Sequence, residues 1–104
     1  MRKQQFKDVT DWQKKTFVNA NSLSKIHHLI EEVNELRDII ETHPGNTDEV
    51  CMEFADCFLL LFGSAAAYGL SYDDICESID TKLEINKNRT WGKPDVNGVV
   101  NHVN

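Results

Sequence analysis

The chain has 104 residues, a formal net charge of −6 and 40% hydrophobic residues. This length suits a single domain with a modest core, and the apolar content is too high for a disordered chain. The acidic balance argues against a general nucleic-acid or anionic-membrane surface, so we expect neither partner. The longest uncharged apolar-rich run, residues 57–72, is too short and too rich in glycine for a membrane span.

The three cysteines and the N-terminus indicate where the protein works. The cysteines are odd in number and form no C-x-x-C pair, which is typical of reduced core thiols. The first residues lack the apolar run of a signal peptide. We therefore predict a cytoplasmic protein.

Two helices are predicted in the first half of the chain. Residues 1–7 are polar and basic and predict a frayed lead-in. Thr10 to Gln13 has the form of a capping box, so we expect a first helix over about residues 8–18. A second helix over residues 22–41 has an apolar stripe, with Glu31, Glu32 and Glu35 on the opposite side. Taken alone, these glutamates are most simply interpreted as a solvated acidic face.

Two further helices and an irregular tail complete the chain. A central helix over residues 47–69 is hydrophobic nearly all round, yet Glu53 and Asp56 lie on one of its stripes. On a fourth helix, residues 71–89, one face carries Lys82, Asn86 and Arg89, which predicts either contact with an anion or salt bridges to glutamates. Residues 90–104 predict an irregular tail that docks elsewhere, for example on a second subunit.

The acidic residues of the two central helices are candidates for a metal site. A short loop makes the helices antiparallel neighbours, so an E-E-x-x-E group and an E-x-x-D group should converge. Buried carboxylates need a cation, a hydrogen-bonded partner or a proton. Oxygen ligands alone select Mg²⁺ or Mn²⁺. Beside cationic and amide donors, such a metal supports hydrolysis of a phosphoanhydride.

These motifs, in this order, resemble the signature of the all-α nucleoside triphosphate pyrophosphohydrolases, the MazG-like superfamily. The run from Lys82 to Arg89 is similar to the downstream phosphate-binding pattern of that family. The segments WQKKTF and WGKPDVNGVVNHV resemble the dATP/dGTP diphosphohydrolase branch, which includes the phage enzymes called MazZ. The resemblance covers about residues 8–93, and it implies that the protein works in a bacterial cell or a phage-infected bacterial cell.

The resemblance implies a fold, a reaction and a set of site residues. It implies a four-helix, bundle-like all-α domain over residues 1–104, completed as a homodimer or homotetramer. It also implies cleavage of a deoxypurine triphosphate to a monophosphate and pyrophosphate with Mg²⁺ or Mn²⁺. The implied metal ligands are Glu32, Glu35, Glu53 and Asp56, and either Glu31 or Glu32 is the catalytic residue that activates water. The implied phosphate-binding residues are Lys82, Asn86 and Arg89, and Trp12 and Gln13 are candidates for contact with the base.

Two alternatives remain open from the sequence. One is an enzyme of the same fold that acts on a pyrimidine triphosphate or on another phosphoanhydride. The other is a non-catalytic helical interaction module, in which the acids are solvated and pair with Lys82 and Arg89. A metal site would raise the melting temperature with Mn²⁺, whereas a salt-bridged bundle would not respond.

Overall fold

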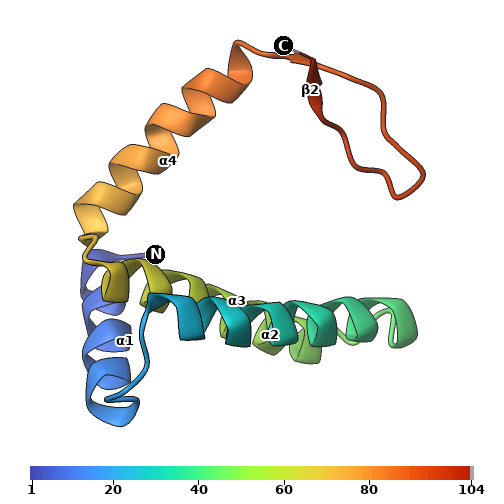
Figure 1. Cartoon of the computed structure of the whole chain (residues 1–104). Coiled ribbons are helices and arrows are strands. Elements are labelled where there is room, and N and C mark those ends of the chain that lie inside the picture. Colours follow the sequence, from blue (N-terminus) through green and yellow to red (C-terminus); the bar gives the residue numbers. More distant parts are fainter. Residues whose placement is uncertain (104) are drawn as a thin grey trace. The chain divides into compact units, whose positions relative to one another are not determined.

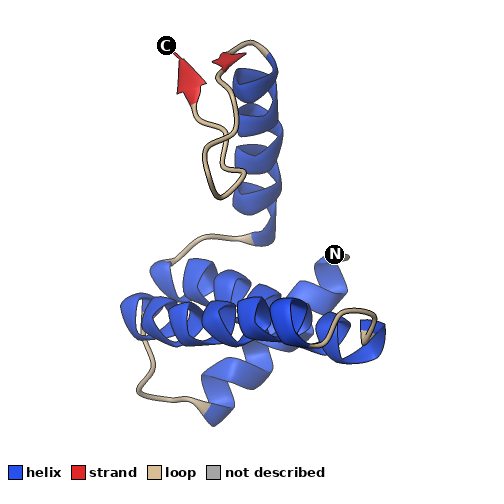
Figure 2. Ribbon diagram, turned by 90° about the vertical axis from the view of Figure 1, so that its right-hand side faces the viewer, coloured by secondary structure: helices blue, strands red, loops and turns tan. Residues whose placement is uncertain are grey.

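A computed structural model describes residues 1–103 of the chain, and within them it contains four helices and one pair of very short strands (Figures 1 and 2). The elements are α1 (Lys3–Thr16), α2 (Ser22–Thr42), α3 (Thr47–Tyr68), α4 (Tyr72–Lys87), β1 (Thr90–Trp91) and β2 (His102–Val103). The predicted all-α fold is confirmed. The chain forms two compact units, the first being Met1–Tyr72 and the second beginning at Asp73, and each is described by itself.

The start of α1 differs from the prediction. The helix begins at Lys3, so residues 3–7 are not a lead-in, and Thr10 is not an N-cap. Thr10 lies inside the helix, where its hydroxyl donates to the carbonyl of Phe6 at 3.0 Å. Phe6 is buried and packs edge-on against Phe62 of α3, with ring centroids 6.1 Å apart. This tertiary contact explains why the helix extends further than its local sequence predicts.

The remaining helix ends lie within two residues of their predicted positions. Asn21 caps α2 with a capping box that includes Ser24. Gly69 follows α3 in the left-handed conformation, as a C-terminal glycine commonly does. The tail is not wholly irregular, because β1 and β2 pair antiparallel with Trp91 opposite His102.

The α2–α3 pair is the centre of the first unit, and the two helices run side by side (Figure 1). The inward-facing residues alternate in spacings of three and four, as in a coiled-coil seam. On α2 they are Ser22, Lys25, Leu29, Glu32, Leu36 and Ile39. On α3 they are Val50, Glu53, Cys57, Leu60 and Ser64. A glutamate therefore interrupts each side of the seam.

One end of this seam is fixed by hydrogen bonds. The hydroxyl of Ser64 donates to the carbonyl of Ser22 at 2.8 Å, and the two serine hydroxyl oxygens lie 3.0 Å apart. At the same end α1 crosses α3, and the side-chain amide of Gln13 donates to the carbonyl of Leu59 at 2.9 Å. Gly63 permits this approach, because a Cβ at that position would lie 2.0 Å from Oε1 of Gln13.

Large apolar side chains remain exposed on the outer faces of α2 and α3. Ile30 and Val33 of α2 are 55% and 46% exposed, and Phe58 and Leu61 of α3 are 52% and 49% exposed.

By length and composition alone, α3 could cross a membrane. It carries Glu53 and Asp56 near its middle, however, and a charged residue at a bilayer centre costs at least about 2.5 kcal/mol.

The second unit consists of most of α4 and the strand pair. The indole N–H of Trp91 donates to the carbonyl of Asn86 at 2.9 Å, which joins the start of the tail to the helix. Between the strands, a carboxylate oxygen of Asp95 accepts from the amides of Asn97 and Val99. The tail thus has a defined turn.

Candidate active site

Three glutamates from α2 and α3 converge in the first unit. One carboxylate oxygen from each of Glu32, Glu35 and Glu53 lies within 4.8 Å of the others. Glu32 and Glu53 are half-buried on the seam, and Glu35 is exposed at its edge. We call these three residues the carboxylate cluster. The sequence predicted all three as metal ligands.

The serine contact at the end of the seam explains why these residues meet. In an antiparallel pair, equal steps from a fixed contact reach facing positions, because both helices rise equally per residue. Glu32 lies ten residues after Ser22 on α2. Phe54, the neighbour of Glu53, lies ten residues before Ser64 on α3. The register set by two serines therefore brings the glutamates together.

The electrostatics of the cluster are unfavourable without a cation. Burial raises the pKa of Glu32, and the nearby Glu35, Asp56 and Glu53 carboxylates raise it further. Burial also raises the pKa of Glu53, with Glu35 and Asp56 adding to the effect. Oε2 of Glu53 is buried and has no hydrogen-bond partner among the described residues. Such an oxygen is an available ligand for a metal ion.

The donor set is suited to a hard cation. Oxygen ligands favour Mg²⁺ or Mn²⁺, whereas zinc and copper favour nitrogen and sulfur. Cys57 lies beside the cluster, and burial raises the pKa of its thiol, so it is protonated and a poor metal ligand at neutral pH. The three cysteines are free, but Cys51 is exposed, so it does not lie in a core as the sequence predicted.

The predicted orientation of the α2 glutamates was wrong for Glu32. Glu32 does not lie opposite the apolar side of α2 but within the seam, between Leu29 and Leu36. The sequence suggested otherwise because Ile30 and Val33 were counted in the core-facing stripe, whereas both are exposed. Of the other predicted acids, Asp56 is exposed beside the cluster, and Glu31 is exposed and outside it.

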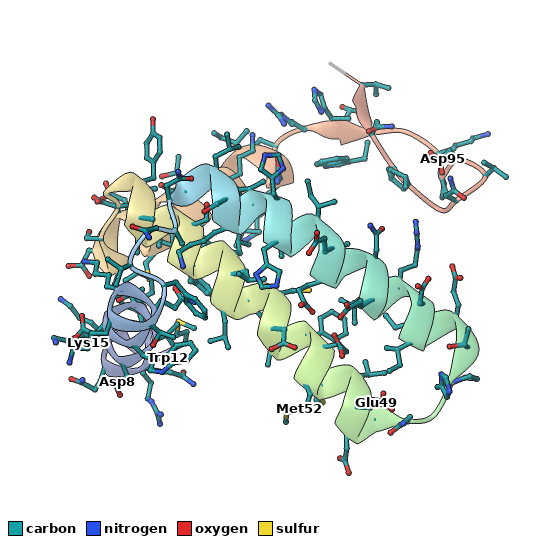
Figure 3. All side chains as sticks on the ribbon, turned by 60° about the horizontal axis from the view of Figure 1, so that its bottom comes forward. Asp8, Trp12, Lys15, Glu49, Met52 and Asp95 are labelled. Atoms are coloured by element: carbon teal, nitrogen blue, oxygen red, sulfur yellow. The ribbon has the colours of Figure 1, made fainter. Side chains whose placement is uncertain are left out.

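A hollow of about 180 Å³ adjoins the carboxylate cluster. Its lining joins Glu32 and Asp56 to residues of α1, among them both candidates for base contact, Trp12 and Gln13. The Trp12 ring, which projects from α1 (Figure 3), packs edge-on against Phe17 with centroids 5.4 Å apart. Gln13 is buried, and its side-chain amide N–H already donates to the carbonyl of Leu59 in α3. Glu49 precedes Glu53 by one helical turn and lies at the end of α3 away from α1 (Figure 3).

The three predicted phosphate-binding residues belong to the second unit. Lys82 and Asn86 lie one turn apart on α4, and Arg89 follows the end of that helix. Oδ1 of Asn86 is buried without a hydrogen-bond partner among the described residues. Along the chain, an amide side chain thus lies between two cationic ones. The role of these three residues in phosphate binding stays a prediction.

Two residues near the cluster were not predicted. Nε2 of His28 lies 3.3 Å from a carboxylate oxygen of Glu32, and Lys25 is buried one turn earlier on α2. Both share a helical face with Glu32, since they precede it by four and seven residues. That spacing is visible in the sequence, but the burial of Lys25 depends on the packing of α2 against α1 and α3.

Comparisons with known proteins identify the family. The model of the dATP/dGTP pyrophosphohydrolase family matches residues 5–104. Among solved structures, the chain resembles the cyanophage S-2L MazG-like pyrophosphohydrolase, which has dGDP and three catalytic Mn²⁺ ions bound per active site. The TM-score is 0.75 at 26% identity, over 95% of this chain and 89% of that one. A comparison with curated proteins gives no match. The chain therefore belongs to the dATP/dGTP pyrophosphohydrolase family, and its fold is that of the MazG-like all-α enzymes.

Proposed function

We propose that the protein hydrolyses dATP or dGTP to the monophosphate and pyrophosphate, with Mg²⁺ or Mn²⁺ held by the carboxylate cluster. The observation that carries this proposal is the convergence of Glu32, Glu35 and Glu53, one of which has a buried carboxylate oxygen with no hydrogen-bond partner among the described residues. Family membership supports the reaction, and the Mn²⁺ ions of the cyanophage enzyme support the choice of metal. Because free deoxynucleotides are found in the cytoplasm, we expect the reaction to take place there.

The residues of the first unit would bind the metal and activate the attacking water. Glu32, Glu35, Glu53 and Asp56 hold the metal, which supplies positive charge to stabilise the phosphates. Glu31, which is exposed and outside the cluster, would orient and deprotonate the attacking water, with Glu32 as the alternative. The reaction consumes one water and breaks the bond between the α and β phosphates, which leaves pyrophosphate.

The residues of the second unit would bind the phosphates. Lys82 and Arg89 carry charges that complement a polyphosphate, and Asn86 carries an amide oxygen with no partner among the described residues. Arg89 is suited to a bidentate contact with phosphate, whereas Lys82 acts as a point charge.

We also propose that the working enzyme is a homodimer or homotetramer. The support is the exposed apolar side chains of α2 and α3, since a single hydrophobic residue, Phe6, is buried among the described residues. A monomer rarely exposes so many large apolar side chains together. Sedimentation of the purified protein at micromolar concentration should give a dimer or larger species, and a stable monomer would contradict this part of the proposal.

The reaction is tested by incubating the protein with each of the four deoxynucleoside triphosphates and Mg²⁺ or Mn²⁺, and resolving the products by anion-exchange chromatography. We expect monophosphate and pyrophosphate from dATP or dGTP, and no reaction with EDTA. Diphosphate with orthophosphate would contradict the reaction class, and turnover of pyrimidine nucleotides alone would contradict the substrate class.

A further inference from the structure

A buried lysine lies near the carboxylate cluster without an acidic partner. Lys25 is 7% exposed, and no ion pair joins it to a carboxylate within residues 1–103. Its ammonium lies 5.5 Å from the ring centroid of Phe17, and burial lowers its pKa. Burying a charge without a counter-charge is costly, so a fold rarely keeps one without a use.

Two adjoining hollows lead from the carboxylate cluster to this lysine. The hollow of about 180 Å³ is lined by Glu32 and Asp56, and a second hollow, of about 250 Å³, is lined by Lys25 and Ser24. Four residues line both of them: Gln13, Phe17, His28 and Leu60. Because they share these walls the two hollows adjoin, and together we call them the path toward Lys25.

Three other hollows of the first unit have no member of the carboxylate cluster in their walls, although one of them, of about 90 Å³, is lined by Lys25 and Gln13. The other two lie beside Val33 and Ile40, and beside Phe58 and Phe62. The path toward Lys25 is thus the apolar space that adjoins the cluster. If the proposed function holds and the phosphates lie at the carboxylates, the base extends along this path.

We propose that Lys25 is a specificity-determining residue that donates hydrogen bonds to the O6 and N7 edge of a purine and makes the enzyme prefer dGTP to dATP. The ammonium group of lysine has three donors and no acceptor. Guanine presents two acceptors on this edge, O6 and N7, whereas adenine presents N7 beside an amino group that is itself a donor. Lys25 therefore complements guanine and opposes the amino group of adenine.

The proposal is tested first on the unmodified protein with nucleotide analogues. The base of dITP keeps O6 and N7 but lacks the 2-amino group, and 7-deaza-dGTP lacks N7. With Mn²⁺ saturating, kcat/KM for pyrophosphate release should be similar for dITP and dGTP, and lower for dATP and 7-deaza-dGTP. If dITP is hydrolysed no better than dATP, the proposal is overturned.

The second test removes the ammonium. In Lys25→Met, the ratio of kcat/KM for dGTP to that for dATP should fall by roughly 10- to 100-fold, as expected for loss of one good base contact. Lys25→Arg keeps the donors and should retain most of the preference. Lys15→Met is the matched control, since Lys15 is exposed on α1 and lines neither hollow, and its ratio should stay at the wild-type value.

The outcomes separate this inference from the proposed function. An equal loss on both nucleotides in Lys25→Met would mean that the lysine only supports the fold, and an unchanged ratio would mean that it does not read the base; either overturns the inference. Competition by dGMP and dAMP gives a binding readout, in which dGMP should inhibit the wild type more strongly. Failure of the wild type to release pyrophosphate from any purine nucleotide would instead overturn the proposed function.

Discussion

The α2–α3 seam carries polar side chains at two levels along its length, a serine level and a glutamate level. The polar groups of the two levels differ in whether they have hydrogen-bond partners. At one level, Ser22 and Ser64 hydrogen-bond to each other and to backbone within the chain. At the other level, Glu32 and Glu53 face each other and Glu35, and a buried oxygen of Glu53 has no partner among the described residues. Both levels lie on the same seam between the same two helices.

The difference distinguishes a structural contact from a ligand site. A satisfied polar pair inside a helix seam fixes register and adds a modest stabilisation. A group of carboxylates with raised pKa values destabilises the folded chain at neutral pH unless something neutralises it. The serine level should therefore affect stability, and the glutamate level should affect metal binding and catalysis.

Glu53→Gln should have the largest effect. It removes a ligand charge from the carboxylate cluster, so hydrolysis of dGTP should fall by at least about 10² to 10³-fold. The rise in melting temperature with Mn²⁺ should disappear, while the metal-free protein should melt at or above the wild-type temperature because repulsion is relieved. Glu77→Gln, at an exposed position on α4, should change neither measurement. A full Mn²⁺ response in Glu53→Gln would contradict the assignment.

Glu31→Gln should separate chemistry from metal binding. Because Glu31 lies outside the cluster, its loss should lower kcat by on the order of 10²-fold, the lower range for a general base. The shift in melting temperature with Mn²⁺ should remain as large as in the wild type. If the variant keeps full activity, the water-activating role passes to Glu32.

Ser64→Ala should have the smallest effect on the reaction and a measurable one on stability. It removes the bond to the Ser22 carbonyl, so the free energy of unfolding in urea should fall by about 1 kcal/mol. The Mn²⁺ response should persist, since no ligand is lost. Ser78→Ala, at an exposed position on α4, is the control and should be nearly neutral. Loss of the metal response without loss of stability would show that the two levels are not separate.

Most of the fold followed from local sequence signals. Asn21 and Gly69 mark helix ends by cap chemistry that does not depend on the rest of the protein, and the ends of α2 and α3 lie within one residue of the predicted ones. The start of α1 was missed because Phe6 packs on Phe62, far away in sequence. The strand pair of the tail was missed because two-residue strands leave no alternation to detect.

The meeting of three carboxylates was predictable from the sequence, but their surroundings were not. The spacing of Glu32, Glu35 and Glu53 on neighbouring helices was enough to predict that they meet. Which face of α2 turns inward was not predictable, since Ile30 and Val33 are as apolar as the seam residues. Lys25 was missed because a lysine on an amphipathic helix is ordinarily exposed, and its burial depends on the packing of α2 against α1 and α3.

The central claim is that the carboxylate cluster holds a divalent cation, and a titration with Mn²⁺ followed by electron paramagnetic resonance tests it most directly. Free Mn²⁺ gives a sharp signal that weakens on binding, so the wild type should suppress it at substoichiometric metal, and a nucleotide should strengthen the effect. Glu53→Gln should leave most of the signal intact at the same concentrations. Equal suppression by both proteins, or none by the wild type even with nucleotide present, would contradict the account.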